Sequence, residues 1–119
     1  MGWTVLIDEA FADELAHVDA AVSFQLVAMS ALLAEFGPHL GRPRADTLKG
    51  SKHSNMKELR FEAADGVWRV AFAFDPIRSA VLLVAGDKSG VSEKRFYKRL
   101  IETADIRFDA HLRALKQGK

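Results

Sequence analysis

The sequence contains no cysteine, which excludes disulfide bonds, thiolate metal ligands and a cysteine nucleophile. It also lacks the GxSxG, P-loop, dinucleotide-binding and zinc-ligand motifs, so the enzyme classes that depend on them are not indicated. No apolar run approaches the roughly 20 residues of a membrane span, and no basic segment precedes the short apolar run near the N-terminus. We therefore expect a cytoplasmic protein with no membrane association, signal peptide, metal or cofactor.

Lysine and arginine are absent from residues 1–36, although the chain has 17 of them and a net charge of +1. The first 36 residues have six acids and a charge of −6, whereas the rest of the chain carries 17 − 10 = +7. This separation favours an anionic partner for the basic part, and an ordinary solvated basic surface is the alternative. The six acids are Asp8, Glu9, Asp13, Glu14, Asp19 and Glu35.

A length of 119 residues with 49% hydrophobic residues predicts one domain over residues 1–119. The local patterns predict an α+β fold with a small, mostly antiparallel sheet and the order β-α-α-β-β-β-α. The first two helices should form a hairpin on one face of the sheet, and a long helix should end the chain. The expected strands are 3–7, 56–62, 67–74 and 80–85; the expected helices are 9–17, a second ending at residue 36, and a third after residue 92; 37–55 is expected to be an irregular loop.

Helix ends and buried helix faces are indicated by capping residues and by apolar residues at steps of three and four. Asp8, Asp19 and Ser92 stand where N-caps are expected. The spacing predicts two buried faces. These consist of Val22, Leu26, Met29, Leu33 and Phe36 in the second helix and of Phe96, Leu100, Ala104, Phe108, Leu112 and Leu115 in the last helix.

Arg69 is the most informative single residue, because it lies in a strand otherwise suited to burial. Alternation places it on the face opposite Trp68 and Phe72, beside the small residues Ala71 and Ala73. Those small neighbours leave room above the sheet for a phosphate, which arginine binds with two parallel hydrogen bonds. A structural ion pair with an acid such as Glu58 is an equally good interpretation.

Further basic groups are expected to converge with Arg69 on one concave surface. Arg60 should lie opposite Phe61, Lys57 should share the side of Leu59 unless the strand begins late or twists, and Lys88 closes the central strand. The long loop would add Lys49, Lys52 and His53, the last as a candidate general acid or base.

Four sequence runs resemble the phage-derived branch of the RelE/ParE/HigB toxin superfamily. They are LKGSKHSNMKELRF, WRVAFAFDP, LLVAGDKSG and EKRFYKRLI, within residues 40–112. The resemblance implies a RelE-like fold, cleavage of mRNA on the ribosome, and neutralisation by a cognate antitoxin, usually of the helix-turn-helix type. The superfamily also includes gyrase inhibitors that do not cut RNA, so a non-catalytic toxin, a nucleic-acid binder and an inactive prophage remnant stay open as alternatives.

The resemblance also implies roles for individual residues. The ribose 2′-OH would attack the adjacent phosphate without a metal, which requires a base, an acid and cations that stabilise the transition state. Arg69 would stabilise that state, Lys88 would hold phosphate or transfer a proton, and Lys57 and Arg60 would bind the RNA backbone. The acid and the base are not assigned. Other candidate RNA-binding residues are Lys49, Lys52, Lys94, Arg95 and Tyr97, of which Tyr97 could stack on a base or simply cover its helix neighbours.

Overall fold

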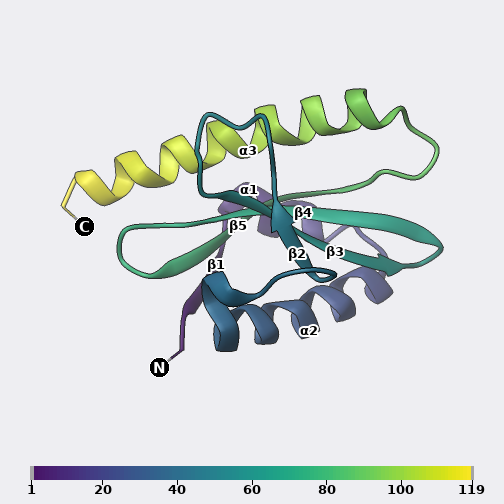
Figure 1. Ribbon diagram of the computed structural model, residues 1–119, viewed down its shortest axis with the longest axis horizontal. Helices are drawn as coiled ribbons and strands as arrows, with labels where there is room; N and C mark the ends of the chain where they lie inside the picture. The colour runs from purple at the N-terminus through teal and green to yellow at the C-terminus, as the bar shows by residue number, and fades with distance from the viewer. Residues whose placement is uncertain (1, 119) are drawn as a thin grey trace.

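The computed structural model describes residues 2–118 and has three layers (Figure 1). A five-stranded sheet lies between helix α2 on one face and helix α3 on the other. The elements are β1 (Thr4–Ile7), α1 (Glu9–Leu15), α2 (Ala20–Phe36), the 3-10 turn η1 (Gly37–His39), β2 (Ala45–Thr47), β3 (Met56–Ala63), β4 (Gly66–Phe74), β5 (Ser79–Asp87) and α3 (Glu93–Lys116).

The sheet has the strand order β1-β5-β4-β3-β2. Strands β3, β4 and β5 form the expected antiparallel meander, but β1 pairs in parallel with β5, so the sheet is mixed. The register between β3 and β4 places Arg60 directly opposite Arg69 and Phe61 opposite Trp68. Because cross-strand partners project to the same face, Arg60 and Arg69 share one face of the sheet, as alternation predicted.

The expectation that residues 37–55 contain no regular element is wrong. This segment contains the turn η1 and strand β2, which pairs with β3 between Ala45–Thr47 and Lys57–Leu59. A three-residue edge strand has no periodic pattern of its own, and here its formation depends on hydrogen bonding to β3. Ala45 is fully buried, which fixes the strand against the core.

The helix caps and the core faces follow the sequence pattern closely. The side chains of Asp8, Asp19 and Ser92 accept hydrogen bonds from backbone N–H groups of the first helical turns. One hydrophobic cluster joins α2 to the sheet, and a second joins α3 to the opposite face. Phe36 departs from the prediction, since 45% of it is exposed at the C-terminal end of α2.

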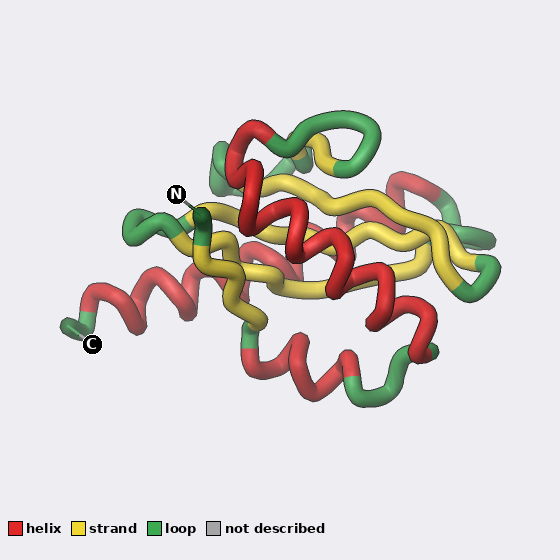
Figure 2. Tube along the Cα trace, turned by 90° about the horizontal axis from the view of Figure 1, so that it is seen from below, coloured by secondary structure: helices red, strands yellow, loops and turns green. Residues whose placement is uncertain are grey.

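The two N-terminal helices pack on the same face of the sheet, as the sequence predicted. Helix α2 lies across that face (Figure 2), and α1 adds the buried Phe11 and the partly buried Leu15 to the same core cluster. Arg107 of α3 holds α1 by donating hydrogen bonds to both carboxylate oxygens of Glu14 at 3.0 and 2.6 Å and to the Leu83 carbonyl at 2.7 Å. The room expected above Ala71 and Ala73 is filled by α3, whose packing explains why these residues are small.

One helical segment meets the length and composition of a membrane span, contrary to the sequence-based expectation. It runs from Ala20 to His39 and is near the N-terminus. Four of its side chains nevertheless lie in the core against the sheet, which explains part of its apolar character. These are Val22, Leu26, Met29 and Leu33.

Candidate functional site

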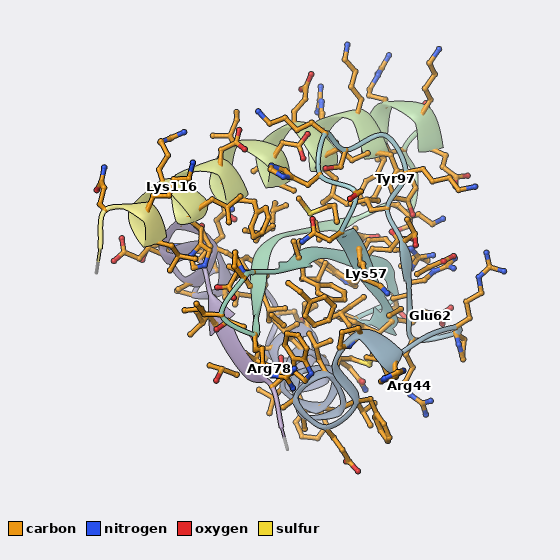
Figure 3. All side chains as sticks on the ribbon, turned by 60° about the vertical axis from the view of Figure 1, so that its left-hand side comes forward. Arg44, Lys57, Glu62, Arg78, Tyr97 and Lys116 are labelled. Atoms are coloured by element: carbon orange, nitrogen blue, oxygen red, sulfur yellow. The ribbon has the colours of Figure 1, made fainter. Side chains whose placement is uncertain are left out.

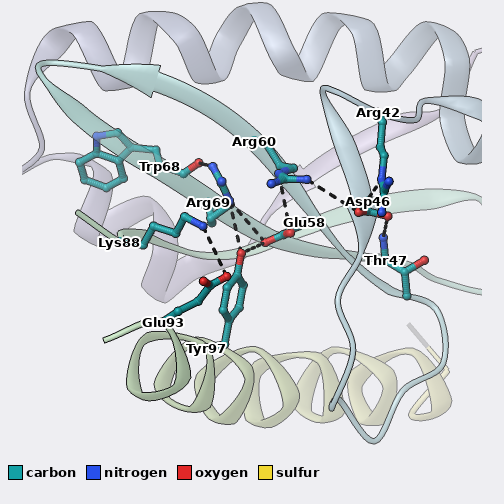
Figure 4. A network of polar contacts seen from close by, with 10 residues as sticks. All are labelled: Arg42, Asp46, Thr47, Glu58, Arg60, Trp68, Arg69, Lys88, Glu93 and Tyr97. Atoms are coloured by element: carbon teal, nitrogen blue, oxygen red, sulfur yellow. Dashed lines mark hydrogen bonds and ion pairs between the residues drawn. The ribbon is translucent and has the colours of Figure 1, made fainter. Parts of the chain in front are cut away.

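Arg69, Tyr97 and Glu58 form a hydrogen-bonded network between the sheet and α3 (Figure 4). Arg69 Nε donates to Tyr97 Oη at 3.3 Å, and Tyr97 Oη donates to Glu58 Oε1 at 2.9 Å. Arg69 Nη1 donates to the Trp68 carbonyl at 2.9 Å, and Arg69 Nε lies 3.8 Å from Glu58 Oε1. Arg69 and Glu58 are each only 6% exposed, so the guanidinium orientation is set by the surrounding protein.

Strand alternation and helix packing bring these three side chains together. Glu58 and Arg60 alternate with Leu59, so both project to the face that carries Arg69. Tyr97 follows the buried Phe96 in the first turns of α3 and packs against it edge to face. The ion pair with Glu58 that the sequence offered as one interpretation of Arg69 is therefore present, and phosphate binding by Arg69 stays a prediction.

The buried position of Glu58 changes its acid–base behaviour. Burial raises the pKa of Glu58, while the hydrogen bond from Tyr97 and the nearby charge of Arg69 oppose that rise. Burial and the contact with Glu58 also raise the pKa of Tyr97, so its hydroxyl stays protonated at neutral pH. The pair thus consists of a proton donor and a carboxyl group that titrates closer to neutrality than an exposed one.

Three arginines line a cavity of about 380 Å³ next to this network, which we call the arginine cavity. Arg42 comes from the loop before β2, Arg60 from β3 and Arg69 from β4. Asp46 pairs with Arg42 at 2.9 Å and with Arg60 at 3.7 Å, and hydrogen bonds from the Thr47 amide and from Arg42 lower its pKa. Guanidinium groups from three segments suit the non-bridging oxygens of a phosphate. The remaining lining residues are Pro43, Phe61, Glu62 and Val67.

Lys88 flanks the network at the end of β5, where the sequence placed it. Its Nζ lies 5.8 Å from the centre of the Tyr97 ring and 3.6 Å from Glu93 Oε2. The Glu93 side chain is 72% exposed, so this ion pair is weak and can be replaced by an anionic ligand.

The start of α3 carries a second group of cations, beyond the network. Lys94 and Arg95 were predicted to bind RNA, and Lys98 and Arg99 join them around a surface depression of about 470 Å³. All four are exposed and form no ion pair within residues 2–118. Figure 3 shows nitrogen-tipped side chains that project into solvent from this end of the helix.

Lys57 does not join the arginine cavity. It pairs across the sheet with Thr47 and Phe72, on the face opposite Arg60 and Arg69. Strict alternation, which predicted that Lys57 shares the side of Leu59, holds here because strand β3 begins at Met56 and its pairing has no break.

His53 and Lys52 lie away from the cavity as well. His53 Nε2 is 2.8 Å from Asp109 Oδ1 and Lys52 Nζ is 2.6 Å from Asp109 Oδ2, and both contacts lower the pKa of Asp109. Asp109 is twelve positions beyond Tyr97, or about 18 Å along the helix axis. Figure 3 shows Tyr97 near one end of α3 and Lys116 at the other. The expected convergence is thus wrong for His53 and Lys52, and Lys49 is exposed on the same loop.

Sequence reasoning missed Glu58 and Arg42 as members of the site. Glu58 was considered only as an ion-pair partner, although its shared alternation with Arg60 already placed it beside Arg69. No local signal marks Arg42, because its position depends on the fold of the loop before β2. Tyr97 was expected on the helix surface and instead lies at the centre of the network.

Similarity to known proteins assigns the chain to a family. The sequence profile described as "Phage derived protein Gp49-like" matches residues 13–109. The chain belongs to this Gp49-like family. Together with the relatives and the solved structure described next, this match confirms the resemblance to the RelE/HigB superfamily found in the sequence.

Two Mycobacterium tuberculosis proteins and one solved structure are similar to this Gp49-like chain. A protein named as toxin HigB2 is 38% identical over 120 residues, which is all of this chain but only 59% of HigB2. A protein named as toxin HigB3 is 44% identical over 95 residues, or 80% of this chain and 74% of HigB3. An arginine-to-alanine double mutant of E. coli toxin RelE in the free state matches with a TM-score of 0.58 and 14% identity, covering 86% of this chain and 96% of RelE. At that identity the RelE likeness concerns the fold alone.

Proposed function

We propose that this chain is the toxin of a toxin–antitoxin pair and cuts mRNA in the cytoplasm, on the ribosome. The relatives named as toxins support the general role, and the arginine cavity beside the Tyr97–Glu58 pair supports the cutting step. The single observation that carries the proposal is the fixed guanidinium of Arg69, which contacts Tyr97 and also borders the cavity.

In the proposed reaction the ribose 2′-oxygen attacks phosphorus and the bond from phosphorus to the 5′-oxygen breaks. The products are a 2′,3′-cyclic phosphate and a free 5′-hydroxyl. Arg60 and Arg69 stabilise the negative charge that develops on the non-bridging oxygens. The 2′-OH proton passes to Tyr97 as Tyr97 transfers its own proton to Glu58, whose raised pKa suits it to accept one. The ammonium group of Lys88 protonates the departing 5′-oxygen.

The test is induced expression followed by mapping of RNA 5′ ends. Arg69→Lys keeps the buried positive charge but lacks the planar guanidinium with its paired donors. It therefore tests the role of Arg69 in cleavage with less disturbance of folding than a truncation to alanine. Arg78→Ala is the matched control, because Arg78 is exposed, outside the cavity and stacked on Trp3. We expect new mRNA ends with wild type and Arg78→Ala, and about 100-fold fewer with Arg69→Lys. Growth arrest with intact mRNA and with DNA damage would contradict the nuclease proposal and favour a gyrase-type inhibitor.

A further inference from the structure

Helix α2 carries an apolar surface that its own fold does not use. Opposite its core face, five apolar residues recur at steps of four, three, four and three, which is the spacing of a helix-packing surface. We call this surface the outer stripe. Phe24 and Val27 at its centre are 73% and 70% exposed, and small alanines beside them permit close approach of another helix. The outer stripe consists of Ala20, Phe24, Val27, Ala31 and Ala34.

The outer stripe continues into a groove between α2 and the edge strand β1. This groove has a volume of about 270 Å³ and is lined mainly by apolar side chains, including Val5, Leu15 and Val27. Ile7 of β1 also lines the groove and is 47% exposed. Three of the eight exposed large hydrophobic residues in the described part of the chain, Ile7, Phe24 and Val27, therefore lie on the outer stripe or in this groove.

The charge around this surface identifies the kind of partner that fits it. Residues 1–36 carry six acids and no lysine or arginine. Arg107 pairs with Asp8 and Glu14, whereas the other four acids form no ion pair within residues 2–118. Two copies joined through α2 would bring two such acidic segments together, and an anionic membrane surface would be repelled in the same way. A helix with an apolar face flanked by lysine or arginine would cover the outer stripe and would also be attracted by these acids.

We infer that the outer stripe and its adjoining groove bind a basic amphipathic helix of the cognate antitoxin. The inference rests on the proposed toxin function for the existence of that partner. Phe24 and Val27 enter the apolar face of the partner helix, and Glu35, exposed one residue beyond Ala34, attracts its flanking cations. The contact lies on the face of the sheet that α2 covers, away from Tyr97 and α3.

The test uses calorimetric titration of the purified chain with the product of the reading frame adjacent to its gene. Phe24→Ser/Val27→Ser should weaken binding about 100-fold, because two exposed central contacts are lost without disturbing the core. Ile106→Ser is the matched control, since Ile106 is 69% exposed on α3, and it should leave affinity unchanged. Glu35→Lys should weaken binding several-fold at low salt and much less at 0.5 M salt, on the order expected from screening.

Several outcomes would overturn the inference. Equal affinity of wild type and Phe24→Ser/Val27→Ser would exclude the outer stripe, and a loss confined to Ile106→Ser would place the contact on α3. Self-association of the wild type that Phe24→Ser/Val27→Ser abolishes in sedimentation velocity, or binding to vesicles containing phosphatidylglycerol, would assign the surface to another occupant. Absence of binding by the wild type would instead contradict the proposed antitoxin partnership itself, whatever the RNA-end mapping shows.

Discussion

Replacement of Arg69 by alanine should destabilise the protein in a way that depends on pH. Arg69 and Glu58 are both 6% exposed, so the truncation leaves a buried carboxyl group without its closest cation. Breaking a buried ion pair from one side costs about 3–5 kcal/mol. The 3.8 Å separation and the remaining hydrogen bond from Tyr97 put the expected loss near the lower limit, about 3 kcal/mol at pH 8. For a domain of this size that corresponds to a fall in Tm of roughly 12 °C.

The pH dependence follows from the raised pKa of Glu58. A group whose pKa is higher in the folded than in the unfolded state contributes stability below the unfolded pKa and loses it as pH rises through the folded one. Removal of Arg69 raises the pKa of Glu58 further, because the opposing charge is gone. The stability difference between wild type and Arg69→Ala should therefore be largest at pH 8 and shrink toward pH 5.

Chemical denaturation at pH 5 and pH 8 checks this prediction. The double variant Glu58→Gln/Arg69→Ala is the control, because the amide retains an acceptor for Tyr97 but carries no charge to bury. It should recover most of the free energy of unfolding lost at pH 8. A loss that is equal at both pH values, or one that the double variant does not recover, would refute the pairing of Arg69 with Glu58.

Three further predictions concern α3 and its contacts. Phe108→Ala should lower the free energy of unfolding by about 3–5 kcal/mol in denaturant titrations, because the ring is 1% exposed in the α3 core, and a loss below 1 kcal/mol would contradict that packing. Arg107→Ala should accelerate amide hydrogen exchange in α1 but not in α3, because the hydrogen bonds from Arg107 to Glu14 hold α1 in place. Equal exchange rates for α1 in the wild type and in the variant would contradict this role. Asp109→Asn should make the free energy of unfolding fall less in acid, because the lowered pKa of Asp109 contributes stability that is lost as pH falls below its ordinary value of 3.8. If the variant and the wild type lose the same free energy of unfolding in acid, this contribution of Asp109 is contradicted.

The features that the sequence predicted well are those fixed by local patterns. Asp8, Asp19 and Ser92 cap helices because a short polar side chain reaches the first N–H groups wherever the helix is placed. Alternation placed Arg60 and Arg69 on one face, because the side-chain period of a strand does not depend on its surroundings.

The features that the sequence missed depend on contacts between distant segments. Strand β2 forms only because β3 offers it a hydrogen-bonding edge. The position of His53 depends on Asp109, 56 residues later, and no spacing rule connects the two. The apolar stripe of α3 predicted that this helix is buried on one side, but not which surface it covers. The small residues Ala71 and Ala73 therefore suggested an open cleft, whereas α3 packs on them.

The placement of the two proposed surfaces has a consequence for neutralisation. The outer stripe belongs to α2, which packs on one face of the sheet, whereas Arg60 and Arg69 project toward the face that carries α3. A helix bound to the outer stripe would leave the arginine cavity open to small ligands, and it would inhibit by keeping a large substrate such as the ribosome from approaching. We therefore expect the toxin–antitoxin complex to bind inorganic phosphate with an affinity within about twofold of that of the free chain, measured by phosphorus NMR titration, because the phosphate contacts are made by residues the partner does not touch. Loss of phosphate binding in the complex would show that the partner reaches the cavity itself.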